Sequence, residues 1–395
     1  MRLGILASHP IQYQAPIFRA LSRRVDLTVF FAHRQTPEQQ AAAGYGVAFD
    51  WDVDLTAGYR SVFLENIAAN PGVAKFGGCD TPSVGAKIRQ AGCDVVLLMG
   101  WNLKSYHQAL WAARARGIPV LVRGDSQLTT PRDPLKRAIK SIVYPLLLAQ
   151  FRGALYVGAR SRDYYKRYGV PNHRLFFAPH CVDEDFFRSR ATAEAGLELR
   201  RRLKIDVNHK VVLFVGRLVP FKRPGDIVEA IHLIGAEGGR IVLLVAGSGE
   251  LAADLKQLAD ERGVRLRMMG FQNQKDLPSI YAASDVLVLP SDANETWGLV
   301  VNEALVSGTP AIVSDKVGCA DDLGGDGVAC RRYRVGDASG LASALCDVFR
   351  DPPSSAKINA LARVHGLSTA VEGVVDAARW AANPPSQSLR TPNAG

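Results

Sequence analysis

Residues 285–315 read DVLVLPSDANETWGLVVNEALVSGTPAIVSD, and the order of their segments indicates the fold class. The apolar runs VLVL and AIVS are continuous rather than alternating, which is typical of strands buried on both faces of a parallel sheet. Between them we expect a loop and then a helix that begins near Thr296. The stretch also places a carboxylate on each side of an apolar piece, at Glu295 and Glu303, where a plain buried helix would have neither.

The same alternation of strand and helix runs along the whole chain. The first half contains the buried runs LGILAS, LTVFFA, DVVLLMG, PVLVRGD, GALYVG and RLFFAP, and the second contains KVVLFVG, RIVLLVAG, LRMMG, DVLVLPS and PAIVSD. Segments of helical periodicity lie between them, such as APIFRALSRR, HQALWAARARG, GDIVEAIHLIG and LAADLKQLADERG. The alternation extends over about 180 residues and occurs twice, which predicts two doubly wound sheets. Ligands of such sheets bind at the carboxyl ends of the strands, so we expect a cleft between two facing domains.

The length of 395 residues supports two domains, because single cores of about 150–200 residues are the norm. The composition, 47% hydrophobic and 22% charged, is that of an ordinary globular protein. We expect a first Rossmann-like domain over residues 1–188 and a second over residues 189–366. A final helix over residues 367–382 is expected to pack back towards the first domain. Residues 383–395 are rich in Pro, Ser and Asn, which predicts a disordered tail.

Charge and cysteine content narrow the class of protein. The formal net charge of +10 points to anionic partners such as nucleotides, nucleic acid or an acidic membrane surface. The six cysteines form no CxxC pair and no Cys/His cluster with zinc spacing, so we expect reduced thiols. The start MRLGILASHP indicates a strand rather than a signal peptide, and no apolar run reaches the roughly 20 residues that cross a bilayer. We therefore expect a cytoplasmic protein, at most peripheral on the inner face of the cell membrane.

The second half carries a candidate anion-binding loop. Residues 211–231, VVLFVGRLVPFKRPGDIVEAI, indicate a strand, a loop and a helix, and the loop contains Gly216, Arg217 and Lys222. A guanidinium and an ammonium just beyond a strand's carboxyl end would neutralise a diphosphate. One strand further on, VAGSGE supplies Gly247 and Gly249, which let backbone approach a ligand closely. A solvated loop with surface ion pairs fits the same residues, and no GxGxxG with a following acid is present.

The helix that we expect near Thr296 would add to this site. Amides at a helix start point at an anion, and here they belong to Trp297, Gly298, Leu299 and Val300. Eight residues of helix would separate Glu295 and Glu303 by roughly 12 Å. That is about the reach from the hexose of a nucleotide sugar to its ribose, and carboxylates accept hydrogen bonds from sugar hydroxyls. The alternative makes Glu295 a partner of the helix dipole and Glu303 a surface residue.

These motifs resemble a known family. GRLVPFK, GSGE and above all ETWGLVVNEALVSGTPAIVSD resemble the donor half of retaining GT-B glycosyltransferases of glycosyltransferase family 4, whose E-x7-E signature matches Glu295 and Glu303. SHPIQYQAPIFRAL and LFFAPHCVD resemble a bacterial branch associated with polysaccharides. The resemblance implies a GT-B fold with an acceptor-binding first domain and a donor-binding second domain.

The resemblance also implies roles for individual residues. Arg217 and Lys222 would hold the donor diphosphate, Glu303 the ribose and Glu295 the transferred sugar, with the base near Phe271. A UDP-sugar is the expected donor, because UDP is the commoner donor nucleotide of the resembled family.

The chain departs from the family pattern at several positions. Many relatives have a glycine pair where this chain has the loop His9-Pro10-Ile11-Gln12, and we place His9 on the acceptor side. The slot where many relatives have an acceptor-facing histidine holds Asp125. Its carboxylate would orient an acceptor hydroxyl or accept its proton, and so help a developing oxocarbenium ion electrostatically. The alternative is that Asp125 caps the turn after its strand. His180 replaces a common asparagine and would line the cleft or fill space. Trp297 stands where phenylalanine is commoner, which should alter packing rather than chemistry.

No metal and no cofactor beyond the nucleotide sugar is expected. In front-face retaining transfer the leaving phosphate oxygen takes the acceptor's proton, and Arg217, Lys222 and the helix amides would stabilise the leaving charge. The pair Asp52 and Asp54 has the DxD form that binds Mn²⁺ or Mg²⁺ in another glycosyltransferase fold. It lies far from the donor residues in the sequence, and we interpret it as part of an acceptor-side loop.

A basic amphipathic segment in the first half bears on the acceptor. Lys136, Arg137 and Lys140 alternate with the apolar residues Leu135, Ile139, Ile142 and Val143. Such a helix can lie on an anionic leaflet, which would favour a lipid-linked acceptor of polysaccharide, lipopolysaccharide or glycolipid assembly. It can equally pack its apolar stripe on the sheet between the domains.

Two other functions are compatible with parts of the same sequence. A nucleotide-sugar epimerase with the same two domains would need an acid and a base across the cleft, and the sequence offers no convincing pair. A basic nucleic-acid-binding protein is the other alternative, but the chain has no RNP-type or zinc pattern and its charge is spread along its length. Neither the sugar nor the acceptor can be inferred from these residues.

Overall fold

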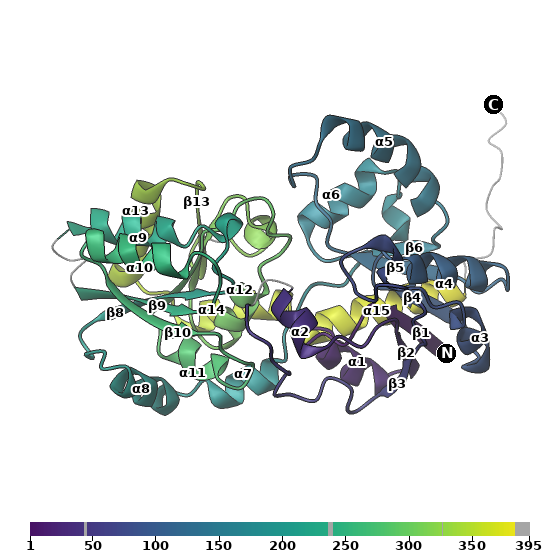
Figure 1. Ribbon diagram of the computed structural model, residues 1–395, viewed down its shortest axis with the longest axis horizontal. Coiled ribbons are helices and arrows are strands. Elements are labelled where there is room, and N and C mark those ends of the chain that lie inside the picture. The colour runs from purple at the N-terminus through teal and green to yellow at the C-terminus, as the bar shows by residue number, and fades with distance from the viewer. Residues whose placement is uncertain (43–45, 236–239, 326, 384–395) are drawn as a thin grey trace.

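The computed structural model describes residues 1–42, 46–235, 240–325 and 327–383, and shows two α/β halves lying side by side (Figure 1). Each half contains one sheet, and every strand pair within the two sheets is parallel. Helices cover both faces of each sheet, so most strand residues are buried. The prediction of two doubly wound parallel sheets is confirmed.

The first sheet has seven strands in the order β3-β2-β1-β4-β5-β6-β7. Its strands are β1 (Arg2–Ala7), β2 (Asp26–Phe31), β3 (Arg60–Phe63), β4 (Val95–Leu98), β5 (Val120–Gly124), β6 (Gly153–Tyr156) and β7 (Leu175–Phe177). The helical segments of this part of the chain are α1 (Ala15–Ser22), α2 (Pro37–Gln40), η2 (Phe76–Gly78), α3 (Val84–Gln90), α4 (Lys104–Arg114), α5 (Pro134–Leu148), α6 (Ala159–Arg167), η3 (Asn172–Arg174), α7 (Glu184–Arg190) and α8 (Ala193–Arg202).

The second sheet has six strands in the order β10-β9-β8-β11-β12-β13. Its strands are β8 (Lys210–Val215), β9 (Ile241–Ala246), β10 (Arg265–Gly270), β11 (Val286–Leu289), β12 (Ala311–Ser314) and β13 (Cys330–Tyr333). The helical segments are η4 (Pro220–Lys222), α9 (Gly225–Leu233), α10 (Ala252–Glu261), α11 (Leu277–Ala282), α12 (Leu299–Val306), η6 (Gly318–Asp321), α13 (Ala338–Arg350), α14 (Ser355–Val364) and α15 (Leu367–Ala382).

Strand order fixes where a ligand can bind. In the first sheet the order reverses between β1 and β4, and in the second it reverses between β8 and β11. Loops after neighbouring strands diverge at such a switch point and leave a crevice at the carboxyl end of the sheet. The loops after β1, β5, β8, β9 and β11 therefore converge on the space between the two halves.

The chain crosses between the halves more than once. α7 packs against α11 and α12 of the second half, so the predicted boundary after residue 188 falls inside a helix that already belongs to the second half. At the other end α15, drawn in yellow in Figure 1, returns to the first half and packs on α1, β6 and β7. The predicted disordered tail, 383–395, lies outside the described residues except for Asn383.

α5 is an exception to the burial of apolar side chains. Five of its apolar residues are at least 47% exposed, namely Leu135, Ile139, Ile142, Val143 and Leu146. Their spacing puts them on one stripe of the helix, which faces solvent instead of packing on the sheet. α5 stands at the outer edge of the first half in Figure 1. Among the residues that the structure describes, no helix combines the length and apolarity that a membrane span requires.

Candidate active site

A cavity of about 360 Å³ lies between the two halves, at the carboxyl ends of both sheets. Loops after β8, β9 and β10 and the start of α12 form most of its wall, and the loops after β1, β2, β5 and β7 contribute the rest. Its first-half residues are Gln12, Tyr13, Trp51, Asp125 and His180. Cavities of several hundred Å³ with few polar groups are typical of small-molecule sites.

The loop after β8 brings two cations to this cavity. Arg217 and Lys222 both line it, and the Arg217 guanidinium lies 5.8 Å from the ring centroid of Phe221. The short helix η4 ends at Lys222 and leaves this lysine only 9% exposed. A buried ammonium is costly unless it is paired, so the site needs an anion next to Lys222.

In the described structure that anion is Glu295. The Lys222 ammonium forms a close ion pair with Glu295 Oε2, and the Ser291 hydroxyl lies 3.4 Å from the same oxygen. The sequence predicted separate roles for the two charges, with Lys222 at the diphosphate and Glu295 at the sugar. Because the two side chains touch, an anionic ligand at this loop has to share Lys222 with Glu295 or separate the pair.

The expected geometry of the two glutamates was wrong. α12 begins at Leu299, three residues later than predicted, so Glu295 lies in the loop and Glu303 only one turn into the helix. The 12 Å spacing along a helix therefore does not apply. The cause is Gly298, whose φ of +97° is not helical and which forms the N-cap. The amides of Leu299 and Val300 belong to the first turn and line the cavity, whereas Trp297 lies before the helix.

Glu303 is a buried carboxyl group that lines the cavity, so the interpretation of Glu303 as a surface residue is wrong. Its side chain is 1% exposed, and the Tyr281 hydroxyl donates a hydrogen bond of 2.6 Å to Oε2. Burial raises the pKa of Glu303 to about 7, against a smaller opposing effect of the Tyr281 hydrogen bond. Oε1 is buried and has no hydrogen-bond partner among the described residues. A buried acceptor without a partner is expected where a ligand supplies the donor.

Asp125 connects the two halves. It follows β5 and its carboxylate accepts a 2.9 Å hydrogen bond from the Thr296 hydroxyl of the second half, while His180 Nε2 lies 3.8 Å away. Burial raises the pKa of Asp125, but interactions with His180 and Thr296 outweigh it and lower the pKa to about 2. Burial lowers the pKa of His180, so at neutral pH a charged carboxylate faces a neutral imidazole. The Asp125 side chain still keeps 44% of its exposure because it faces the cavity.

Aromatic residues shape two walls of the cavity. Trp297 is 3% exposed, its indole N–H donates to Asn302 Oδ1 at 2.9 Å, and its ring lies 5.8 Å from that of His180. Phe271 also lines the cavity, and its ring centroid lies 4.3 Å from that of Phe49. Phe271 offers an apolar surface for a base, while Trp297 packs the floor under the start of α12.

Two of the predicted site residues do not line the cavity. Burial lowers the pKa of His9 to about 4, and its Nδ1 lies 3.0 Å from the Ser8 hydroxyl. Gly249 stands where a Cβ would lie 2.4 Å from the Leu218 carbonyl oxygen, and Gly247 where it would lie 1.8 Å from that of Gly216. Gly249 thus serves close packing of two loops. Gly216 and Gly247 do line the cavity.

Hydrogen bonds within the protein already engage one oxygen of each carboxylate of the DxD pair, while Asp52 Oδ1 is buried without a partner among the described residues. Asp52 Oδ2 accepts a hydrogen bond of 3.1 Å from the Lys275 amide across the cleft, and Asp54 accepts from Thr56 and Ala57 in its own turn. No group of three or more His, Cys, Asp or Glu side chains with metal-binding geometry occurs among the described residues.

The sequence did not predict several residues that the structure places in the cavity wall. They include Gln12, Tyr13, Trp51, Gln272 and Gln274. Gln12 lies in the loop that departs from the family's glycine pair, and Trp51 lies next to the DxD pair. For both residues, a neighbouring motif in the sequence already pointed to the site. Gln272 and Gln274 follow β10 and reach the site only through the pairing of β10 with β9.

Two parallel α/β halves that face each other across a ligand cavity define the GT-B class of fold. Solved structures agree. The Anabaena protein HepE in complex with UDP superposes with a TM-score of 0.72 at 17% identity, over 95% of this chain and 99% of that chain. The expected GT-B fold is confirmed.

The second half is similar to a known protein family. Residues 197–365 match the family model described as Glycosyl transferases group 1. Among curated proteins, a D-inositol 3-phosphate glycosyltransferase of Xylanimonas cellulosilytica is 35% identical over 39% of this chain and 38% of its own length. A protein of the same name from Nocardia farcinica is 29% identical over 71% of this chain and 62% of its own length. The matches thus cover less than two thirds of these relatives.

Proposed function

We propose that this protein is a retaining glycosyltransferase that moves a sugar from a nucleotide diphosphate donor to a hydroxyl acceptor. One observation carries the proposal: a single cavity combines two cations, the start of α12 and the buried Glu303 with an unpartnered oxygen. The cations and helix amides suit a diphosphate, and the unpartnered carboxyl oxygen suits a sugar hydroxyl. The glycosyl transferases group 1 match over residues 197–365 supports it.

The donor fits the second half in one direction. Arg217, Lys222 and the amides of Leu299 and Val300 would hold the diphosphate, and Glu303 would accept a hydrogen bond from the ribose. The base would lie against Phe271, and the transferred sugar would lie towards Glu295 and the first half. We propose UDP as the nucleotide, supported by the solved structure of HepE with UDP.

The proposed reaction breaks the bond between the anomeric carbon and the diphosphate oxygen and forms one to the acceptor oxygen on the same face. The leaving phosphate oxygen takes the acceptor's proton, so the step needs neither a metal nor a separate protein base. Arg217 and Lys222 stabilise the leaving charge. Asp125 is a weak base at neutral pH because its pKa is about 2. We assign it to orienting His180 and to stabilising positive charge at the anomeric carbon.

A thermal-shift screen of nucleotide sugars against the purified protein tests the donor. A ligand at 100 times its Kd stabilises a protein by about 2.7 kcal/mol. We expect UDP and a UDP-sugar to raise the melting temperature, and Glu303→Ala to abolish most of the shift. Glu65 is exposed and forms no ion pair with the residues that the structure describes, so Glu65→Ala is the matched control. If no nucleotide or nucleotide sugar stabilises the parent protein, the proposal is wrong.

Product analysis separates transfer from epimerisation. Incubated with the stabilising nucleotide sugar alone, a transferase releases at most free sugar and UDP, whereas an epimerase changes the sugar and keeps the nucleotide bond. We expect transfer once an acceptor is supplied, with the anomeric configuration of the donor retained in the product. A changed sugar still bound to UDP would favour the epimerase.

We further propose that α5 docks on an anionic membrane, where it would meet a lipid-linked acceptor for polysaccharide, lipopolysaccharide or glycolipid assembly. The stripe from Leu135 to Leu146 is exposed, and Lys136, Arg137 and Lys140 flank it. Insertion of apolar side chains beside cations suits an anionic leaflet, at about 1 kcal/mol for each cation near the surface.

Vesicle sedimentation tests this docking. We expect binding to vesicles with phosphatidylglycerol, little binding to pure phosphatidylcholine, and loss of binding in Ile139→Ser/Ile142→Ser/Leu146→Ser. Val207→Ser is the control, since Val207 is 73% exposed but lies in the second half. Equal binding by the triple variant and the parent would contradict the membrane proposal and leave the donor proposal intact.

A further inference from the structure

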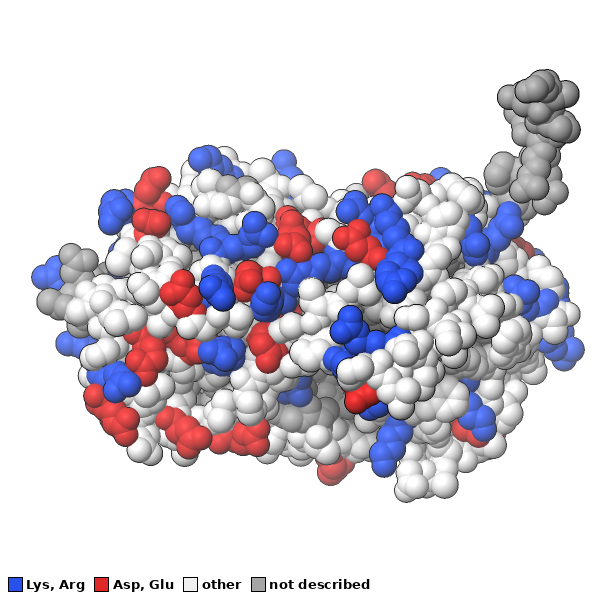
Figure 2. All heavy atoms as spheres, turned by 90° about the horizontal axis from the view of Figure 1, so that it is seen from above, with Lys and Arg blue, Asp and Glu red and all other residues white. Residues whose placement is uncertain are grey.

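A second cavity lies in the first half, beneath α5. It has a volume of about 570 Å³ and is bounded by the loop between β5 and α5, by α5 itself and by α6. Figure 2 shows the face of the molecule on which α5 and α6 stand, with Lys and Arg side chains gathered along the boundary between the halves. The loop that forms one wall begins at Asp125, so this cavity adjoins the candidate active site.

The cavity is strongly basic. Arg132, Arg137 and Arg167 line it, and no acidic residue contributes to its lining. None of the three guanidinium groups forms an ion pair with any residue that the structure describes. Arg162, on the same helix as Arg167, does pair with a carboxylate, that of Asp163. Three unpaired arginines around one cavity favour an anion with several acceptor oxygens.

Two buried polar groups at the cavity also have unused hydrogen-bonding capacity. Gln127 is 1% exposed and Tyr164 is 2% exposed, and both line the cavity. Gln127 Oε1 and the Tyr164 hydroxyl are buried with no hydrogen-bond partner among the described residues. Thr129, Thr130 and Ser141 add further hydroxyl groups to the lining. Buried polar atoms without partners are rare and call for a ligand that pairs with them.

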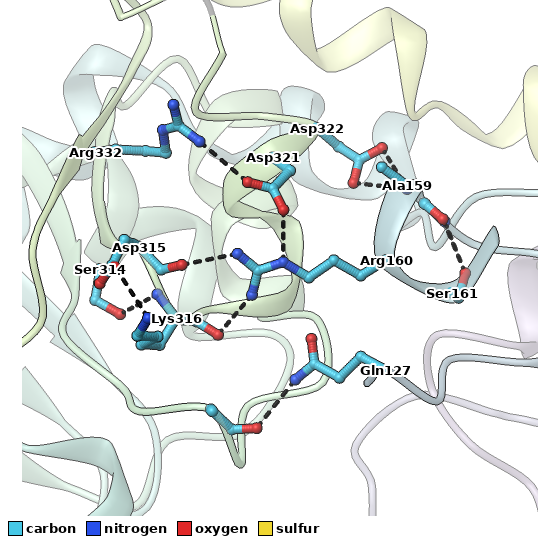
Figure 3. A network of polar contacts seen from close by, with 12 residues as sticks. Gln127, Ala159, Arg160, Ser161, Ser314, Asp315, Lys316, Asp321, Asp322 and Arg332 are labelled. Atoms are coloured by element: carbon cyan, nitrogen blue, oxygen red, sulfur yellow. Dashed lines mark hydrogen bonds and ion pairs between the residues drawn. The ribbon is translucent and has the colours of Figure 1, made fainter. Parts of the chain in front are cut away.

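The position of Gln127 ties this cavity to the active site. Its Nε2 donates hydrogen bonds to the carbonyl oxygens of Ala293 at 3.0 Å and Glu295 at 3.2 Å. Figure 3 shows the Gln127 side chain reaching from the first half to a backbone oxygen of the second. Gln127 follows Asp125 by two residues, which is roughly 7 Å of extended chain. A ligand that reaches Gln127 Oε1 therefore lies one side chain away from the loop that carries Glu295.

We infer that this cavity binds the phosphoryl group of a phosphorylated acceptor, with the arginines and Tyr164 on the phosphate and Gln127 on a hydroxyl. The inference rests on the proposed function, because it assigns the substrate class of the same reaction. Its volume is more than a bare phosphate needs and suits a phosphorylated sugar or polyol. The phosphate belongs either to a free sugar phosphate or to a lipid headgroup held under α5.

Calorimetry with the donor site filled tests the free form. UDP binding is measured first, and then glucose 6-phosphate, glucose 1-phosphate and glucose are titrated into the UDP complex. We expect a sugar phosphate to bind at least tenfold more tightly than glucose, and Arg132→Ala/Arg167→Ala to weaken that binding at least tenfold. Arg162→Ala/Lys166→Ala, on α6 but outside the lining, is the matched control. Tyr164→Phe should weaken binding without removing a charge.

Vesicles distinguish the lipid source. If free sugar phosphates do not bind, vesicles with phosphatidic acid should bind the parent more tightly than vesicles of equal charge made with phosphatidylglycerol, and Arg132→Ala/Arg167→Ala should remove the difference. Binding of neither source above glucose or phosphatidylglycerol overturns the inference, as does an unaffected double variant. Loss of the UDP signal in the parent would instead contradict the proposed function, so the two failures are distinguishable.

Discussion

Glu303 is a residue at which ligand binding and folding stability oppose each other. A carboxyl group buried to 1% exposure with one hydrogen bond is destabilising when it is ionised, and burial raises its pKa from 4.5 to about 7. A ligand hydroxyl that donates to Oε1 would relieve that cost. The site is therefore prepared for a ligand at the expense of stability in the free protein.

The raised pKa predicts how stability depends on pH. Between pH 4.5 and 7 the folded protein keeps a proton on Glu303 that the unfolded chain has released, so the free energy of unfolding falls as pH rises through this range. The shift corresponds to about 3 kcal/mol. In Glu303→Gln this contribution should disappear, so the variant should gain stability relative to the parent at pH 8 but not at pH 4.5. Urea unfolding at both pH values measures this, with Glu65→Gln as control. An unchanged pH dependence would contradict it.

The ion pair between Lys222 and Glu295 predicts a separable effect on stability and rate. Lys222→Met leaves the Glu295 carboxylate, which is 15% exposed, without its partner. Breaking a fully buried ion pair lowers the free energy of unfolding by about 3–5 kcal/mol, so we expect a loss up to that size. The substitution also removes stabilisation of the leaving diphosphate, worth roughly 10²–10³ in turnover. Lys222→Met/Glu295→Gln should regain most of the stability and none of the turnover.

Urea unfolding and steady-state turnover on the identified donor measure the two effects of Lys222→Met. Lys256→Met, on exposed α10, should change neither. Turnover equal to that of the parent in either Lys222 variant would remove this residue from the proposed mechanism.

At the residue scale, the sequence predicted those site residues that differ in charge or polarity from their neighbours in the chain. Arg217 and Lys222 follow a buried strand, and Glu303 is a carboxylate in an apolar helix, so each stands out from its neighbours. The contact between Lys222 and Glu295 joins residues 73 apart and depends on the loops after β8 and β11 meeting at a switch point. No local pattern encodes that meeting. The orphaned oxygens of Glu303 and Gln127 likewise require the packed structure.

At the scale of elements, the strands that the sequence missed are β3 and β13. Both lie at the edge of their sheets. No residue of β3 is fully buried, and the two central residues of β13, Arg331 and Arg332, are charged and at least partly exposed. An edge strand needs no continuous apolar run because one side of it faces solvent. The runs predicted for the central strands all became strands, since burial on both faces demands an uninterrupted apolar sequence.

The start of α12 depends on a single glycine. Gly298 has a φ of +97°, and a Cβ there would lie 2.5 Å from Leu289 Cδ2. Gly298→Ala should therefore cost at least about 1–2 kcal/mol in backbone strain alone. It should also displace the amides of Leu299 and Val300 and weaken UDP binding.

Gly308→Ala is the matched control, because Gly308 ends the same helix with a φ of +84° and open space around its Cβ. Unfolding and UDP titration of both variants test the prediction. We expect both to lose stability and only Gly298→Ala to lose affinity. Equal UDP affinity in the two variants would show that the start of α12 does not contact the donor.

At the scale of the whole molecule, polar contacts hold the two halves together away from the cavity. Asp322 accepts hydrogen bonds of 3.0 Å from the Ala159 amide at the start of α6, and Asp321 pairs with Arg160 at 2.7 Å. Figure 3 shows Arg160 reaching from α6 to the backbone of Asp315 and Lys316 as well. Apolar packing also crosses between the halves, at the Phe49–Phe271 ring pair and where Val157 joins the core of the second half. The polar contacts of α6 therefore add to an interface that is partly apolar.

The donor residues from Gly216 to Glu303 all belong to the second half, while Asp125 and the second cavity belong to the first. The distance between donor and acceptor is therefore set by the interface, and misplacement by about 1 Å can cost up to roughly 10² in rate.

Arg160→Ala removes three contacts of 2.7–2.8 Å across the interface between the halves. It should lower turnover about tenfold or more, leave the Kd for UDP within about twofold, and increase the radius of gyration in solution scattering. Arg162→Ala, which removes only a contact with the neighbouring Asp163, should change none of these. A loss of UDP affinity equal to the loss of turnover would show that the interface shapes the donor site instead of positioning the acceptor.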